Sequence, residues 1–263
     1  MSEQEIALSG GNSNEEVVRV NDTVRRATSA QSSTVHRFLT YLSKSGLDCS
    51  PKFLGIDSKG RESLTYMHGE CAISPDHWRE DKYILTAADL LREFHDASSG
   101  YVGTDIDVWG YVYPDESKHE VICHNDFAPY NLVSDDKGFT SIIDFDLAGP
   151  GPRLRDIAYA AYWLTPLSQH ATDMRQFAIA DAKSGSKRLK LFCRRYGVTP
   201  DLPLLDMIDS VLLHMADRNE MERCIGPEKT AQLVAEGHID HWQAEASAFD
   251  RCRHIIEENL FSK

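Results

Sequence analysis

The segments ICHNDFAPYNLV (Ile122–Val133) and SIIDFDLAGPG (Ser141–Gly151) decide how this sequence folds. Each contains an apolar run of the kind found in buried strands, next to a cluster of polar residues. Between them lies DDKG (Asp135–Gly138), whose composition is typical of a tight turn. The pattern therefore predicts a β-hairpin, and its two strands bring Asn131 and Asp144 together at the open end.

These segments also contain polar residues in the order expected of a phosphoryl-transfer site. His124, Asp126 and Asn131, followed by Asp144, match the order and the Asp-to-Asn spacing of the kinase catalytic loop and its metal-binding Asp. Phosphates carry concentrated negative charge that divalent cations must neutralise, and carboxylate and amide oxygens suit magnesium. We therefore predict that Asn131 and Asp144 bind Mg²⁺. Asp126 is predicted to be the catalytic carboxylate that orients an acceptor hydroxyl and takes its proton.

An isolated Asp and Asn pair is more often a cap or a turn than a catalytic site. Here the loop spacing, the predicted hairpin and the apolar run before Asp144 occur together, which favours the functional interpretation.

HNDFAPYN (124–131) and IIDFDLAGPGPRLRDIAYA (142–160) resemble the catalytic loop and the metal-binding strand of the aminoglycoside-phosphotransferase and choline-kinase superfamily. This resemblance assigns the main metal role to Asp144 and leaves Asp146 as a candidate for supporting it or for binding a second metal. It implies that Asp156 supports the catalytic loop. His124 is expected to brace the same loop, with proton exchange as the less favoured alternative.

The first third of the chain predicts a small sheet with one helix. The β-prone runs 16–20 and 23–26 are separated by Asn21-Asp22, a turn sequence. A helix is expected over 33–45, because its apolar residues recur on one stripe and a glycine follows it. Further extended runs, PKFLGID and SLTYM, come next.

After Gly69 the pattern becomes mainly helical. A helix is expected over 84–97, and helices dominate from Asp156 to the end with breaks near 197–203 and at Gly226-Pro227. The predicted fold class is α+β: a protein-kinase-like two-lobed fold whose larger, mainly helical lobe carries the catalytic hairpin. The expected domains are a nucleotide-binding lobe, residues 1–69, and a catalytic and substrate-binding lobe, residues 70–263.

The same resemblance extends more weakly to the nucleotide site. Residues 10–20 resemble the nucleotide-covering hairpin, but no GxGxxG is present, so the loop would use small residues including Ser13. YMHGE resembles the hinge beside the adenine, which makes Met67 and His68 candidate nucleotide contacts.

Arg25 and Arg26 stand in TVRR, the strand on which kinases usually carry a phosphate-contacting Lys. The planar fork of an arginine can also neutralise phosphates, with a different geometry from an ammonium. Alternation from Val24 favours Arg26, although both arginines could be solvated strand residues. The helix that follows offers no obvious Glu partner, and His36 lies near the place where one would be expected.

Composition sets the broad class of the protein. Hydrophobic residues at 41% and charged residues at 26% are typical of a folded globular chain. A net charge of -13 disfavours nucleic acid as a partner and favours a neutral or amine-bearing one. The cysteines are too widely spaced for a zinc or redox motif, so free thiols are expected. No secretory signal or membrane-spanning stretch is recognisable, and a cytoplasmic location is therefore predicted.

We therefore predict a small-molecule kinase that transfers the γ-phosphoryl group of ATP or GTP, with Mg²⁺, to a hydroxyl of a small substrate. A pseudokinase that binds nucleotide or a partner without turnover is the main alternative, because the Lys on the TVRR strand is missing. A protein kinase is disfavoured by the missing glycine loop and by the absence of DFG and APE sequences. The oligomeric state stays open.

Substrate recognition is expected in the helical lobe. The acidic candidates for that role, which could equally form a solvated helix face, are Asp206, Asp209, Asp217, Glu220 and Glu222. The tryptophans that could stack on a ring or a quaternary amine, but more commonly pack in cores, are Trp78, Trp109, Trp163 and Trp242.

Overall fold

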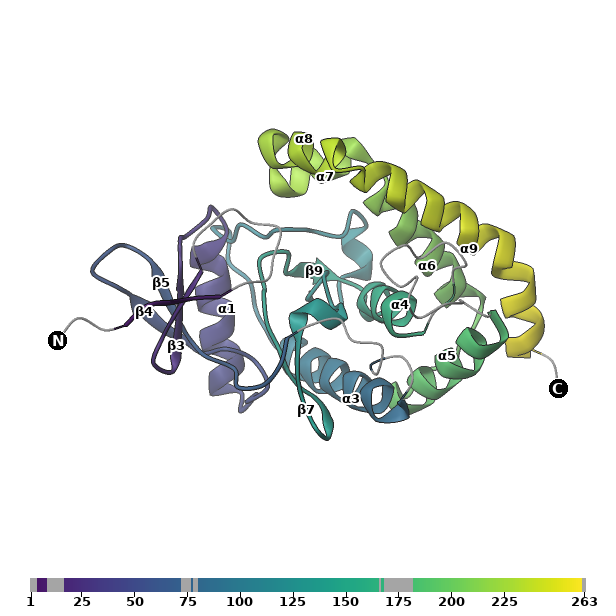
Figure 1. Cartoon of the computed structure of the whole chain (residues 1–263), viewed down its shortest axis with the longest axis horizontal. Helices are drawn as coiled ribbons and strands as arrows, with labels where there is room; N and C mark the ends of the chain where they lie inside the picture. Colours follow the sequence, from purple (N-terminus) through teal and green to yellow (C-terminus); the bar gives the residue numbers. More distant parts are fainter. Residues whose placement is uncertain are drawn as a thin grey trace.

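The computed structural model describes residues 4–8, 17–71, 77, 80–165, 167 and 182–261. A small lobe that contains the five-stranded sheet and helix α1 lies beside a larger lobe built mainly of helices (Figure 1). The α+β, two-lobed architecture predicted from the sequence is confirmed.

The N-terminal sheet is antiparallel, with strand order β1-β2-β3-β5-β4. Its strands are β1 (Ile6–Ala7), β2 (Val18–Val20), β3 (Thr23–Arg26), β4 (Phe53–Ile56) and β5 (Glu62–Thr65). Asn21, with φ of 54°, makes the predicted turn between β2 and β3, since Asn tolerates the left-handed region better than most residues. Strand β1 was not predicted; it pairs antiparallel with β2, and the residues between these two strands include 9–16, which lie outside the described residues.

Helix α1 (Ser32–Lys44) closely matches the prediction for 33–45. Val35, Phe38, Leu39 and Leu42 recur at helical intervals and are buried in the core. Each such side chain contributes about 1.5–3 kcal/mol by leaving water. The helix stops before Gly46, which has φ of 85°.

Gly69 and Glu70 lie in the segment that follows β5, the last strand of the N-terminal sheet. Glu70 exchanges two backbone hydrogen bonds with Ser134, at 2.9 and 2.8 Å, so the connection is tied to the catalytic hairpin. Gly69 has φ of 141°, and a Cβ on it would lie 2.5 Å from the Ser134 carbonyl oxygen. Only glycine fits this approach without strain.

The larger lobe begins with the long helix α3. Its helices are α3 (Asp81–Ser98), α4 (Arg153–Leu164), α5 (Ala182–Tyr196), α6 (Leu202–Met215), α7 (Arg218–Ile225), α8 (Pro227–Ala235) and α9 (His238–Phe261). Its short strands and turns are η1 (Glu116–Lys118), β6 (Val121–Cys123), η2 (Pro129–Asn131), β7 (Leu132–Asp135), β8 (Gly138–Ile142) and β9 (Gly149–Gly151). The predicted helix breaks near 197–203 and at Gly226-Pro227 are confirmed. Helix α3 starts three residues before the expected 84.

Strand β9 was not predicted, and its Gly-Pro-Gly sequence has the composition of a turn. It nevertheless pairs antiparallel with β6, with Cys123 opposite Gly149 and Val121 opposite Gly151. The Tyr111 carbonyl oxygen would lie 1.7 Å from a Cβ on Gly149. Close packing of backbone on this strand, rather than intrinsic strand propensity, therefore explains the glycine.

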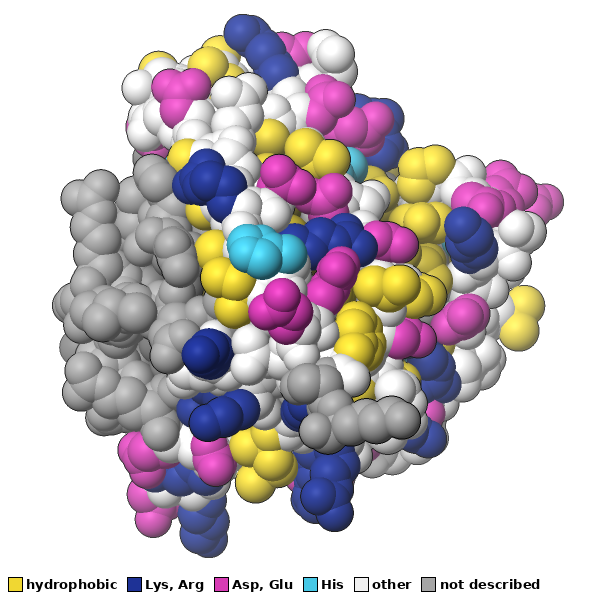
Figure 2. Space-filling model, turned by 90° about the vertical axis from the view of Figure 1, so that its right-hand side faces the viewer, with side chains coloured by type: hydrophobic (Ala, Val, Ile, Leu, Met, Phe, Trp, Pro, Cys, Tyr) yellow, Lys and Arg dark blue, Asp and Glu magenta, His cyan; other side chains and the backbone are white. Residues whose placement is uncertain are grey.

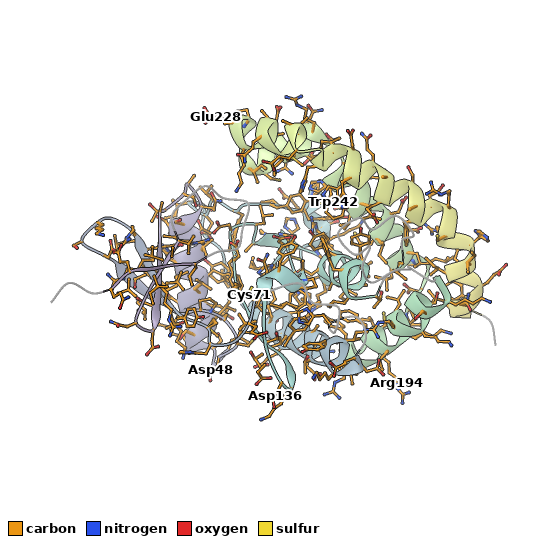
Figure 3. The ribbon with its side chains drawn as sticks, in the orientation of Figure 1. Asp48, Cys71, Asp136, Arg194, Glu228 and Trp242 are labelled. Carbon is orange, nitrogen blue, oxygen red and sulfur yellow. The ribbon has the colours of Figure 1, made fainter. Side chains whose placement is uncertain are left out.

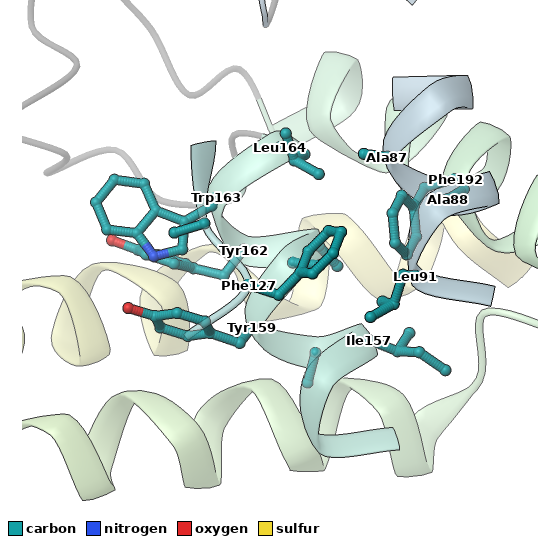
Figure 4. Close-up of a cluster of buried hydrophobic side chains, with 14 of the residues drawn as sticks. Ala87, Ala88, Leu91, Phe127, Ile157, Tyr159, Tyr162, Trp163, Leu164 and Phe192 are labelled. Atoms are coloured by element: carbon teal, nitrogen blue, oxygen red, sulfur yellow. The ribbon is translucent and has the colours of Figure 1, made fainter. Parts of the chain in front are cut away.

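The core of the larger lobe anchors the catalytic loop. Phe127, which follows Asp126 directly, is fully buried and points between α4 and α3, toward Leu91 (Figure 4). Tyr159, Tyr162 and Trp163 of α4 lie on the other side of the same cluster (Figure 4). Burial of this aromatic side chain stabilises the loop by about 1.5–3 kcal/mol.

All six cysteines are free thiols, as predicted, and four of them are buried. In the described part of the chain, none of the helices combines the length and the apolar character needed to span a bilayer.

Candidate active site

The predicted hairpin is formed by β7 and β8, with a register shift between Val133 and Ser134. Leu132 pairs with Ile142 and Asp135 with Gly138. Beyond the last pair, the Ile143 amide donates to the Asn131 carbonyl at 2.9 Å. Asn131 therefore lies across from Ile143, immediately beside Asp144, as the sequence predicted.

Asp156 on α4 organises the backbone of the catalytic loop. Its carboxylate accepts hydrogen bonds from the amides of His124 and Asn125, at 2.6 and 2.8 Å, and lies 3.1 Å from His95 Nε2. Burial alone would raise the pKa of Asp156, but the hydrogen bond and charge interactions with His95 hold it below its usual value. The supporting role expected for Asp156 is confirmed.

His124 is a brace whose two ring nitrogens are both occupied. Nε2 lies 2.9 Å from the Ile143 carbonyl oxygen and so donates to it, which leaves Nδ1 to accept from the Asp126 amide at 3.3 Å. The residue is fully buried. These contacts favour bracing over proton exchange, as the sequence analysis expected.

The Asp126 carboxylate is held by one donor on each oxygen. Tyr130 donates its hydroxyl hydrogen to Oδ1 at 2.6 Å, and Asn131 Nδ2 donates to Oδ2 at 2.8 Å. The Tyr130 hydroxyl also lies 3.0 Å from that of Tyr159. Burial raises the pKa of Asp126, and the hydrogen bond from Tyr130 opposes that rise. A carboxylate oriented in this way can accept a proton from an alcohol. The sequence analysis missed Tyr130.

Asn131 and Asp144 offer hard oxygen atoms at the open end of the hairpin. Asn131 Nδ2 is used by Asp126, and these bonds leave the amide Oδ1 available. The Asp144 side chain is 46% exposed, and its backbone has φ of 63°. Non-glycine residues in this region of φ cluster at functional sites. A carboxylate and an amide oxygen make a donor set that fits magnesium.

The two arginines of β3 point to opposite faces of the sheet. The guanidinium of Arg26 contacts Asp144 at 3.3 Å and Asp146 at 3.1 and 2.5 Å. Arg25 instead lies 3.7 Å from Asp57, near the turn between β4 and β5. The structure therefore brings Arg26, and not Arg25, to the catalytic hairpin, as alternation from Val24 favoured.

Glu62 supplies the acidic partner of Arg26 that the sequence analysis did not find. It lies opposite Arg26 in the β3–β5 register, is almost fully buried, and accepts from Arg26 Nε. Its second oxygen contacts His36 Nε2 on α1. A buried Glu needs a cation nearby, but the burial of Glu62 follows from the pairing of β5 with β3, which the sequence does not specify.

The other predicted nucleotide contacts either bond to neighbours in the N-terminal part of the chain or fall outside the described residues. Ser13 and the rest of the covering loop fall among residues the structure does not describe. His68 is exposed and lies 3.3 Å from Asp22, with its ring edge against Tyr66. The Met67 sulfur is 4.0 Å from the Thr65 hydroxyl, on the stretch that leads to Gly69.

Cys71 marks the junction of the lobes, where its label lies in Figure 3. Its thiol donates to the Tyr130 carbonyl at 2.7 Å, so the connecting segment touches the catalytic loop directly. Burial raises the pKa of Cys71 to about 11, and the charge of Asp144 adds to the rise.

Most of the acidic residues considered for amine recognition have other partners. Asp206 pairs with Arg253 of α9, and Glu222 pairs with Arg218 at 3.0 Å. Charges of both signs are interspersed on the face of the larger lobe shown in Figure 2. The solvated-face interpretation is therefore favoured for these residues.

Asp217 and Glu220 line a groove of about 370 Å³ between the 111–115 segment and helices α6 and α7. The groove is lined by Tyr111, Tyr113, Pro114, Asp115, Ser210, Leu213, His214, Asp217 and Glu220. The lining therefore includes two tyrosine rings and three acidic side chains. Among the tryptophans, Trp163 and Trp242 pack against one another in the core, and Trp109 packs on Phe38. Trp78 lies outside the described residues.

Comparison with known proteins agrees with this geometry. The model of the "Phosphotransferase enzyme family" matches residues 107–192, which include Asp126, Asn131 and Asp144. The trifolitoxin immunity protein of Rhizobium leguminosarum bv. trifolii is 27% identical over 231 residues, covering 85% of this chain and 87% of that protein.

Solved structures share the fold at low identity. An ethanolamine kinase of Plasmodium vivax matches with a TM-score of 0.62 and 12% identity, over 95% of this chain and 83% of its own. A gentamicin complex of an aminoglycoside phosphotransferase matches with a TM-score of 0.57 and 14% identity, over 94% and 93%. A choline/ethanolamine kinase family protein of Mesorhizobium loti matches with a TM-score of 0.55 and 17% identity, over 98% and 90%. The family model thus matches the segment from 107 to 192, and these solved structures show that the chain shares their two-lobed fold.

Proposed function

We propose that this protein is a small-molecule kinase that transfers the γ-phosphoryl group of ATP or GTP to a hydroxyl of a small substrate. The observation that carries the proposal is the hydrogen-bonded pair of Asp126 and Asn131 at the open end of the hairpin that also bears Asp144. Carboxylates and an amide in this arrangement suit phosphoryl transfer, because catalysis there is mainly positioning and charge neutralisation.

In the proposed reaction Asp126 acts on the acceptor. Its carboxylate orients the hydroxyl and takes its proton as the oxygen bonds to the γ-phosphorus and the bond to the β–γ bridging oxygen breaks. Tyr130 and Asn131 hold that carboxylate in place. Asn131 Oδ1 and Asp144 would hold Mg²⁺, which neutralises phosphate charge when bound.

The nucleotide would lie between the lobes. Arg26 is the proposed phosphate-contacting cation, because it lies beside Asp144 whereas Arg25 pairs with Asp57. Met67 and His68 remain candidate contacts for the base, and Ser13 for the phosphates. We retain Gly69 as the proposed boundary between a nucleotide-binding lobe, 1–69, and a catalytic and substrate-binding lobe, 70–263.

An amine-bearing alcohol is the acceptor class that the charge distribution favours. In the groove beside Tyr111, Asp217 is the carboxylate that could attract an organic cation, because Glu220 already pairs with Arg223 and the guanidinium groups of Arg155 and Arg223 lie over the Tyr111 ring. The net charge of -13 acts in the same direction.

The test is a screen of aminoglycosides, amino alcohols and sugars with magnesium and ATP or GTP, measured by nucleoside diphosphate formation. Asp126→Asn, which keeps the size of the side chain, is the matched variant. We expect turnover with at least one acceptor in the wild type and its loss in Asp126→Asn, with nucleotide affinity retained. Wild-type turnover in Asp126→Asn would remove this residue from the mechanism. Nucleotide binding without transfer to any acceptor would instead support the pseudokinase alternative.

A second candidate, immunity to a toxin, is favoured by the match to the trifolitoxin immunity protein, which extends over most of both chains. Expression of the wild type and of Asp126→Asn in cells sensitive to trifolitoxin tests it. Protection by both would indicate immunity through binding, protection by the wild type alone would indicate immunity through phosphoryl transfer, and no protection would exclude this candidate.

A further inference from the structure

The guanidinium of Arg26 is held on two edges by carboxylates from the two lobes. Its Nε donates to Glu62 on the neighbouring strand β5. Its Nη1 and Nη2 donate to the two oxygens of Asp146, which follows the catalytic hairpin, at 3.1 and 2.5 Å. The contact from Nη1 to Asp144 is longer, at 3.3 Å. The strongest geometry of Arg26 is therefore the two-pronged pair with Asp146.

Glu62 is itself fixed on its far side. Its second oxygen contacts His36 Nε2, and the His36 ring stacks on Phe53 with centroids 3.7 Å apart and planes 11° apart. Glu62 is 1% exposed, so its charge is compensated within the protein. The plane of the Arg26 guanidinium is thus set from the N-terminal sheet.

We propose that Glu62 and Arg26 position the metal-binding loop from the N-terminal lobe through Asp146, which is a positioning residue and not a second magnesium ligand. This inference rests on the proposed function. The proposed role also explains why position 26 is an arginine, where kinases usually have a lysine. A planar fork can engage carboxylates on two edges at once, whereas an ammonium is a compact point charge.

The arrangement leaves Arg26 able to serve the phosphates. An arginine has five N–H groups, and the contacts to Glu62, Asp144 and Asp146 use four of them. The bond to Asp144 is the longest, and Asp144 is 46% exposed. If Asp144 held Mg²⁺ instead of contacting Arg26, Arg26 would have a second N–H available for phosphate and could keep its pair with Asp146.

Thermal unfolding of the metal-free protein, in EDTA, is the first test. If Asp146 positions the loop through Arg26, Asp146→Asn lowers the melting temperature by about 2–4 °C or more. The matched change Asp144→Asn should leave the melting temperature unchanged or raise it, because it removes repulsion between two neighbouring carboxylates. An unchanged or raised melting temperature in Asp146→Asn would overturn the inference.

Nucleotide binding is the second test, by calorimetry with a magnesium complex of a non-hydrolysable ATP analogue. Arg26→Lys and Asp146→Asn should each weaken binding roughly tenfold. The double variant should bind no more weakly than either single variant, because the two residues act as one unit. Multiplied losses in the double variant would show that Asp146 acts independently, as a metal ligand would, and would overturn the inference.

The control is Arg37→Lys. Arg37 of α1 also pairs with an aspartate of the other lobe, Asp107, at 2.5 Å, but it makes no described contact with the metal loop. The affinity of the Arg37→Lys variant for the nucleotide analogue should equal that of the wild type. If the Arg26→Lys variant bound the nucleotide analogue as tightly as the wild type does, this inference would be overturned, and the proposed function would not. Absence of nucleotide binding by the wild type would instead overturn the proposed function, and the melting experiment would still report on Asp146.

Discussion

Replacement of Asp156 by alanine should cost more stability than an ordinary single substitution. The change removes the acceptor for the amides of His124 and Asn125, which lie 2.6 and 2.8 Å from the carboxylate in a fully buried site. Each buried donor left without a partner costs about 1–3 kcal/mol. The two together predict a loss of about 4 kcal/mol in the free energy of unfolding, or roughly 8–16 °C in melting temperature.

The assay is equilibrium unfolding in urea, followed by tryptophan fluorescence. Asp136→Ala is the matched control, because Asp136 is exposed at the tip of the hairpin (Figure 3) and its loss should change stability by less than about 0.5 kcal/mol. Asp156→Asn keeps the size of the side chain and one acceptor oxygen, so this variant should lose an intermediate amount of unfolding free energy. If Asp156→Ala lowered the free energy of unfolding by less than about 1 kcal/mol, the claim that this carboxylate stabilises the loop backbone would be refuted.

The effect of Asp156 should also depend on pH with a definite sign. The folded-state pKa of this carboxyl is lowered, so its contribution is fully present above the unfolded-state pKa of about 3.9. The contribution is lost as the pH falls through the lower folded-state value. The stability difference between the wild type and Asp156→Ala should therefore be constant from pH 5 to 7 and shrink only in stronger acid. A difference that shrinks between pH 7 and 5 would contradict this assignment.

Three further predictions concern the junction of the lobes. Gly69→Ala should destabilise by about 2 kcal/mol in urea unfolding, because its Cβ would lie 2.5 Å from the Ser134 carbonyl oxygen at a φ of 141°; unchanged stability would show that the approach is not rigid. Tyr130→Phe removes the hydrogen bond to Asp126 and should lower kcat ten- to a hundredfold with an unchanged KM for nucleotide; a changed KM alone would contradict a role limited to Asp126. The Cys71 thiol donates to the Tyr130 carbonyl and has its pKa raised to about 11, so it should react with thiol reagents at pH 8 more slowly than free cysteine; faster reaction would contradict that pKa.

The catalytic hairpin was predictable because its information is local. The turn at 135–138 and the apolar runs on either side set the pairing, and the pairing alone brings Asn131 beside Asp144. The choice of Arg26 over Arg25 followed from alternation along one strand, which is also local.

Features that depend on partners far apart in the chain were missed. Glu62 contacts Arg26 only because β5 pairs with β3, and the sequence near either residue does not indicate that pairing. Strand β9 is built from Gly-Pro-Gly, which local propensity assigns to a turn, and it is extended because β6 and the 110–113 segment pack on both sides of it. The hydrogen bond of Tyr130 to Asp126 depends on the short 3₁₀ turn at Pro129–Asn131, which loop spacing does not specify.

The most direct test of the account is manganese binding in the presence of a non-hydrolysable ATP analogue, followed by electron paramagnetic resonance. Mn²⁺ takes the same oxygen ligands as Mg²⁺. The account predicts that Asp144→Asn and Asn131→Ala each weaken the nucleotide-dependent site at least roughly tenfold, and that Asp136→Asn leaves it unchanged. Equal manganese affinity in the wild type and in both site variants would contradict the claim that the hairpin holds the metal.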